Sequence, residues 1–179
     1  KDTLEAKQLL AVVRPILVNG EKWQQASAVA ACESFFKDRA LNLESKECFS
    51  LAKLCYHYGV GNQKSLGFLC LVKDKNCLIE KRVRSAVILL GEDDLTASKQ
   101  KEVLEACVLI VESSMQLLRN GEVGVLNSAL FAGSQVLQHS TDTGLKRRVL
   151  VIAKKFIENS VFSEPVFMTK DDHKIPFSL

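Results

Sequence analysis

Apolar residues recur at helical spacing in about eight consecutive segments between residues 2 and 163, and short polar or glycine-containing turns separate the segments. In one segment, small and apolar side chains fall at positions i, i+3, i+4, i+7 and i+11 from Leu126 to Leu137. Asn-Gly pairs at 19–20 and 120–121 are typical of the point where a helix ends. The pattern predicts an all-α domain of antiparallel helix pairs over residues 1–163.

Two of these segments have features that modify the simple pattern. The first contains Pro15, which has no backbone N–H to donate, so we expect a helix that is kinked or split there. The sixth contains the continuous apolar run 106–111, which predicts a central helix that is buried on most sides. Thr96 or Ser98 is suited to cap the start of that helix.

The helical pattern stops after Ser163. Residues 164–179 contain apolar side chains on both sides of the polar stretch 170–173, which favours an extended tail or a small hairpin. We expect this tail to pack on the last helices, or else to dock onto another chain. Its aromatic residues Phe167 and Phe177 are candidate contact residues.

The composition is that of an ordinary globular domain. The chain has 179 residues, of which 47% are hydrophobic and 25% charged, so one domain with a sizeable core is expected. The formal net charge is only +3, which does not make phosphate binding the default expectation.

The cysteines indicate a reducing compartment. The chain has six cysteines, nearly all within apolar helical stretches, and Cys48 and Cys55 share one stripe with Leu51 and Ala52. Zinc sites use closely spaced pairs such as CxxC, which the sequence lacks. We therefore predict buried free thiols and an intracellular location, cytoplasmic or nuclear.

Membrane insertion is not expected. The longest apolar run, 106–111, is far shorter than the roughly 20 residues that a transmembrane helix needs. No secretory signal is recognisable, and because the chain begins with Lys1 we expect it to be a piece of a larger protein.

No motif for catalysis is recognisable. His57, His139 and His173 lie in different parts of the chain, and there is no nucleophile elbow, zinc-protease motif, Walker loop or dinucleotide fingerprint. The acidic cluster 92–94 is typical of a helix start rather than of a calcium loop. We predict a protein that is not an enzyme, with no catalytic residue, no cofactor and no metal.

Basic residues form two clusters, which are candidate partner-binding sites. The first predicted cluster lies on the fifth helical segment and consists of Lys81, Arg82 and Arg84. The second lies on the eighth and consists of Lys146, Arg147, Arg148, Lys154 and Lys155. Each cluster is compatible with a solvated face, with a contact to an acidic protein, or with nucleic-acid binding. The fifth and eighth helices belong to opposite layers of a helix-pair stack, so one continuous basic groove is not predicted.

The helix pairs of roughly 40 residues, the proline within the first helix and the alanine-rich second helix resemble a HEAT or armadillo-like repeat. This resemblance implies an α-α superhelix of stacked pairs that binds other macromolecules. Tubulin-binding TOG domains are HEAT arrays in which a tryptophan in the first intra-repeat loop contacts tubulin, and here Trp23 follows the turn 19–22. Similarity to that subtype implies a tubulin contact at Trp23; a tryptophan packed at a helix start is the alternative.

Together these observations predict a non-catalytic protein-interaction or scaffold module. We expect a groove formed by the second helix of each pair, in which a partner peptide or helix would bind. A nucleic-acid-binding helical repeat that uses the basic faces is the alternative, and the TOG-like domain is a further one. Flanking repeats or self-association would cover exposed apolar ends of the stack.

Overall fold

The computed structural model describes residues 2–37, 46–118 and 123–161. This part of the chain contains eight α-helices and no strand, so the prediction of an all-α domain with about eight helices is confirmed. In chain order, the helices are α1 (Asp2–Asn19), α2 (Lys22–Lys37), α3 (Lys46–Tyr58), α4 (Asn62–Lys73), α5 (Ile79–Leu90), α6 (Ala97–Leu118), α7 (Val123–His139) and α8 (Thr143–Val161).

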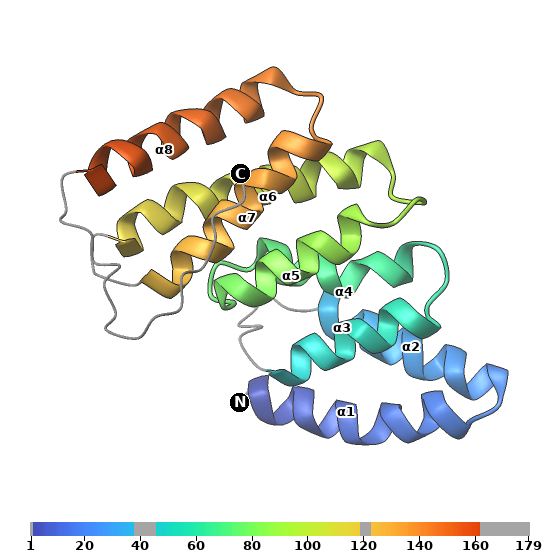
Figure 1. The fold of residues 1–179 in the computed structure, drawn as a ribbon. Coiled ribbons are helices and arrows are strands. Elements are labelled where there is room, and N and C mark those ends of the chain that lie inside the picture. The colour runs from blue at the N-terminus through green and yellow to red at the C-terminus, as the bar shows by residue number, and fades with distance from the viewer. Residues whose placement is uncertain (1, 38–45, 119–122, 162–179) are drawn as a thin grey trace, which may run out of the picture.

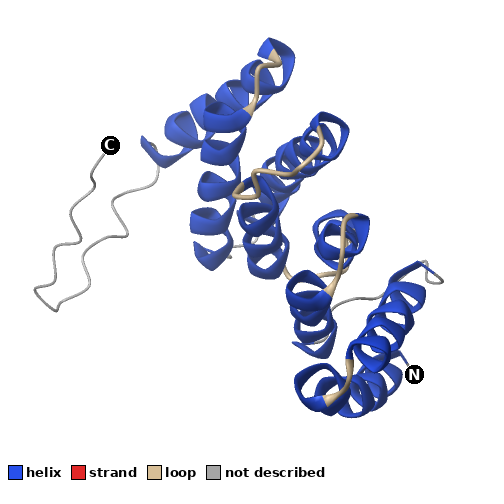
Figure 2. Ribbon diagram, turned by 90° about the vertical axis from the view of Figure 1, so that its right-hand side faces the viewer, coloured by secondary structure: helices blue, strands red, loops and turns tan. Residues whose placement is uncertain are grey.

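The helices form a stack in which α1 and α8 lie at opposite ends (Figure 1). Each helix packs against the next one in the chain, and most also pack against the next but one. One series of contacts joins α2, α4, α6 and α8, and other contacts join α1 to α3 and α5 to α7. Seen from the side, the helices follow one another in a stepped row (Figure 2).

The first helix is continuous, so the expectation that Pro15 could split it is wrong. Proline removes the backbone N–H that would bond to the carbonyl four residues earlier, here that of Ala11. Both Pro15 and Ala11 lie on the exposed side of α1, where water can satisfy that carbonyl. The buried face of the helix, which includes Val13 and Leu17, is therefore preserved.

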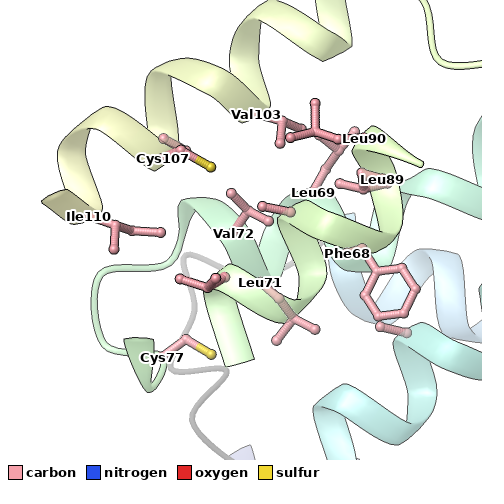
Figure 3. Packing of buried hydrophobic residues seen from close by; sticks show 14 of the residues in the cluster. Phe68, Leu69, Leu71, Val72, Cys77, Leu89, Leu90, Val103, Cys107 and Ile110 are labelled. Carbon is pink, nitrogen blue, oxygen red and sulfur yellow. The ribbon is translucent and has the colours of Figure 1, made fainter. Parts of the chain in front are cut away.

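The packing of α3 against α4 is centred on Phe68, which is fully buried. The ring centroid of Phe68 lies 5.7 Å from that of Phe49 and 5.6 Å from that of Tyr56, both on α3. On the other side of α4, Leu71 and Val72 belong to the core that α4 shares with α5 and α6 (Figure 3). The fourth helix thus contributes to two adjoining parts of one core.

All the cysteines are free thiols, as predicted, and the prediction that they are buried is confirmed for all but one. Five are buried and Cys70 is half-buried. A hydrogen bond between the thiols of Cys32 on α2 and Cys55 on α3 raises the pKa of Cys55 and lowers that of Cys32. Both side chains act as part of the apolar contact between the first helices.

The tail predicted over 164–179, including Phe167 and Phe177, lies outside the described residues. Within the described part, the chain ends in α8, whose inward face carries Leu145, Val149 and Ile152.

Candidate partner-binding surface

A hollow on the described surface has a volume of about 880 Å³. It lies between the segment from the end of α4 to the start of α5, residues 73–82, and one face of α6. Leu78 and Ile79 contribute apolar side chains from the first wall, and Ala106 and Leu109 contribute them from α6. We call this the main hollow; it is large enough for several side chains of a bound segment.

Leu109 is the most informative residue of the main hollow. It sits in the apolar run of α6 between buried Val108 and buried Ile110, yet 49% of its own surface is exposed. The helix therefore buries its other apolar face against the core and presents Leu109 to solvent within the hollow. The run is therefore buried on most sides, as predicted, and Leu109 lies on its exposed side.

Carboxylates surround Leu109 along the same stripe of α6. Glu102, Glu105 and Glu112 line the main hollow, and Glu80 lies on the opposite wall. Glu102 forms an ion pair with Lys73. Glu105 is exposed and lies 3.9 Å from the ammonium of Lys101, a distance at which an exposed pair contributes little.

A buried arginine supports the wall of the main hollow. Only 5% of Arg82 is exposed, and its Nε donates a hydrogen bond of 3.0 Å to the carbonyl oxygen of Val72. Val72 is in the last turn of α4, where carbonyl groups lack helical partners, so the arginine satisfies one of them. Burial lowers the pKa of Arg82, and the nearby Cys77 and Asp74 oppose that shift.

Two buried thiols belong to the core next to the main hollow, Cys77 before α5 and Cys107 on α6 (Figure 3). Burial raises the pKa of Cys107 on α6 to about 12, and burial together with Asp74 raises the pKa of Cys77 to about 11. Thiols with such pKa values are almost entirely protonated at neutral pH, and the protonated form is neither a good nucleophile nor a metal ligand.

A second hollow, of about 420 Å³, adjoins α8. Arg147, Val151 and Lys155 line it, and we call it the α8 hollow. Glu112 lines both hollows, and its carboxylate accepts hydrogen bonds of 2.7–2.9 Å from the guanidinium of Arg148. This bidentate pair therefore marks the boundary between the main hollow and the α8 hollow.

The structure places the two predicted basic clusters differently. On α5, Arg82 is buried, Arg84 lies with its guanidinium carbon 5.6 Å from the Phe49 ring centroid, and Lys81 is half-buried. These side chains do not form one exposed basic patch. On α8, Arg148 pairs with Glu112 and Lys154 lies 3.7 Å from Glu158, whereas Arg147 and Lys155 line the α8 hollow.

Trp23 lies in another part of the stack. It is 66% exposed, so it is not the packed helix-start tryptophan that was the alternative to a tubulin contact. Its Nε1 donates a hydrogen bond of 2.7 Å to a carboxylate oxygen of Glu21. It lies on α2, and no residue of that helix lines the main hollow.

The described residues contain no group of three or more His, Cys, Asp and Glu side chains placed to hold a metal ion. His57 is exposed on α3 and His139 is half-buried at the end of α7, while His173 lies outside the described part. Across the described ranges, every helix is too short or too polar to span a bilayer.

Sequence reasoning did not identify Leu78, Leu109 or Glu105 as candidate binding residues. A signal was present for Leu109, which is a single leucine within the stripe that also carries Glu102, Glu105 and Glu112. For Leu78 there was none, because its exposure depends on how the turn after α4 is placed.

We compared the chain with protein-family models, with curated proteins and with solved structures, and none of the three comparisons found a match.

Proposed function

We propose that this domain is a non-catalytic protein-interaction module that binds a peptide or helix of a partner protein in the main hollow. The observation that carries the proposal is the exposure of Leu109 in a hollow of about 880 Å³. An exposed apolar side chain within a concave surface and surrounded by charged residues is typical of the anchor position of a protein interface.

The arrangement of the helices supports a HEAT or armadillo-like superhelix for this module. In such stacks each repeat contacts its neighbours, and here the main contacts join helices one or two places apart in the chain. Second helices of successive pairs would then share one surface, and α6 and α8 line the two hollows. An intracellular scaffold within a larger protein fits the free thiols.

Nucleic-acid binding is the weaker proposal. Phosphate binding needs several cations on one face, whereas the walls of the main hollow carry four glutamates beside Lys73, Lys75 and the buried Arg82. The exposed cations of α8 favour an anionic contact only beside Arg147 and Lys155.

The test is affinity capture from cell extract with the purified domain, followed by mass spectrometry. Wild type is compared with Leu109→Asp and with the matched control Leu150→Asp, which alters a leucine that is 55% exposed on α8. We expect a set of proteins that Leu109→Asp loses, that Leu150→Asp retains, and that nuclease treatment leaves unchanged.

Two other results would assign the binding site to another part of the surface. Capture that nuclease abolishes would favour the nucleic-acid alternative, and its affinity should then fall steeply with salt. Capture of tubulin that Trp23→Ala abolishes and Leu109→Asp does not would favour the TOG-like alternative.

A further inference from the structure

The two hollows adjoin each other but differ in charge. The main hollow has Glu80 and Glu105 on facing walls, and its cations are Lys73, which pairs with Glu102, the exposed Lys75 and the buried Arg82. The α8 hollow has Arg147 and Lys155. Glu112 and Arg148 lie between them and neutralise each other through their bidentate pair. A segment lying over α6 from one hollow to the other would meet a hollow with more glutamates than cations first, then a neutral boundary, and then the cations of α8.

Apolar side chains accompany the charges in both hollows. Leu78 and Leu109 are exposed in the main hollow, and Val151 is exposed in the α8 hollow. A bound segment could therefore bury apolar side chains in each hollow, while its charged side chains fix its direction. Complementary charges around an interface determine orientation and partner choice more than they raise affinity.

We propose that the partner segment is an amphipathic helix of opposed charge, which crosses α6 from the main hollow to the α8 hollow. Its basic end lies against Glu80 and Glu105, and its acidic end lies against Arg147 and Lys155. This inference rests on the proposed function, because it specifies the chemistry of the segment that the main hollow would bind.

The dimensions suit a short helix. Glu105 and Glu112 are seven residues apart on α6, which corresponds to about 10 Å along the helix axis. Packed helices such as α6 and α8 lie about 8–10 Å apart. A partner helix of about 16 residues is roughly 24 Å long and can reach both hollows.

The experiment begins with a display library of random peptides of about 16 residues, selected on the wild-type domain. Peptides that also bind the Leu109→Asp variant are discarded. The peptides that remain should carry Lys and Arg in one half and Asp and Glu in the other, with apolar residues at helical spacing. The strongest binder is then synthesised, and its affinity is measured by fluorescence anisotropy.

Charge reversal locates each end of this peptide. Glu105→Lys and Arg147→Glu should each weaken binding by about tenfold, because each places like charges together. Reversing the basic half of the peptide should restore its affinity for Glu105→Lys, and reversing the acidic half should restore its affinity for Arg147→Glu. The matched control is Glu158→Lys, which also changes an exposed glutamate with a lysine four residues earlier and should leave affinity within about twofold.

The outcomes separate this inference from the proposed function. The crossing helix is overturned if the Leu109-dependent peptides have a uniform charge. It is also overturned if Glu105→Lys weakens their binding and Arg147→Glu does not. Either result leaves the main hollow as a protein-binding site. Failure to obtain any Leu109-dependent peptide overturns both. Thermal melts of each variant show that the comparison is made between folded proteins.

Discussion

The two halves of the stack both place a glycine between packed helices, but these glycines have different neighbours. A Cβ atom at Gly67 on α4 would lie 2.8 Å from the backbone Cα of Ala52 and 2.9 Å from the Phe36 ring. A Cβ atom at Gly133 on α7 would meet side-chain methyl groups, at 3.1 Å from Val149 and 3.6 Å from Val111. The first contact is fixed by the backbone, and the second can be adjusted by side-chain movement.

This difference indicates where the molecule can accommodate a partner. Between α2 and α4, aromatic rings and thiols fill the space close to the backbone. Between the α4–α5 turn and α8, two hollows remain and charged side chains line them. The closely packed helices α1 to α4 are therefore suited to holding the fold, and the surface with room for a ligand lies beside the helices of the other half.

The largest effect on stability is expected from removing an aromatic side chain from the core between α3 and α4. Phe68→Ala leaves a cavity against Phe49 and Tyr56, so the free energy of unfolding should fall by about 3–5 kcal/mol. The same truncation at Phe131, which is 49% exposed on α7, should cost less than about 1 kcal/mol. Urea denaturation measures both, and equal losses would mean that the halves are equally well packed.

The two glycines test the comparison directly. Gly67→Ala forces the α3 and α4 backbones apart, so we expect a loss of about 2 kcal/mol, which is typical of overpacking. Gly133→Ala gains about 1 kcal/mol of helix propensity, which offsets the cost of moving Val149. Its stability should therefore stay within about 0.5 kcal/mol of wild type. A lower denaturation midpoint for Gly133→Ala than for Gly67→Ala would contradict the view that only the Gly67 contact is fixed by the backbone.

High pH should weaken the core beneath the main hollow. Cys107 has an ordinary pKa of 9.0, and burial raises it to about 12 in the folded protein. The stability that the neutral Cys107 thiol contributes is complete below pH 9.0 and is lost as the pH rises from 9.0 toward about 12. The reason is that the thiol ionises at a lower pH in the unfolded chain than in the folded protein. Over that range the thiol lowers the free energy of unfolding by about 1.4 kcal/mol per pH unit.

The control for this prediction is Cys107→Ala, which removes the ionising group. Its unfolding free energy, measured between about pH 9 and 11, should fall less steeply with pH than that of wild type. Its packing cost is the same at every pH and does not change the slope. Identical slopes for the two proteins would show that Cys107 does not titrate in this way.

The smallest effect on stability is expected in the hollow itself. Leu109→Asp and Leu150→Asp each change a half-exposed leucine, so each should alter the free energy of unfolding by about 0.5 kcal/mol or less. A loss several times larger for Leu109→Asp alone would show that this leucine belongs to the core. Thermal denaturation at one protein concentration is sufficient for the measurement.

The sequence predicted features that depend on position along a helix. The stripe of Cys48, Leu51, Ala52 and Cys55 is buried, and Thr96 caps α6 by accepting a hydrogen bond of 3.4 Å from the backbone N–H of Lys99. Periodicity and capping are local properties, so a single sequence contains them.

Features that depend on neighbouring helices could not be predicted in the same way. Arg82 was predicted as part of a basic surface, but α5 is rotated so that its guanidinium reaches the end of α4. The apolar run of α6 predicted a helix buried on most sides, but not that the exposed side would carry Leu109. The orientation of a helix about its axis depends on all of its packing partners, and the sequence pattern alone leaves a choice where apolar residues cover most of the helix.

The main contacts of each helix are with helices no more than two places away in the chain. Such a molecule has a low contact order, which is typical of fast folding. During synthesis, each helix could acquire its neighbours as soon as the next two had left the ribosome, without waiting for the rest of the chain. The same locality allows the structure to open from its ends, so amide hydrogens in α1 and α8 should exchange with solvent before those of α4.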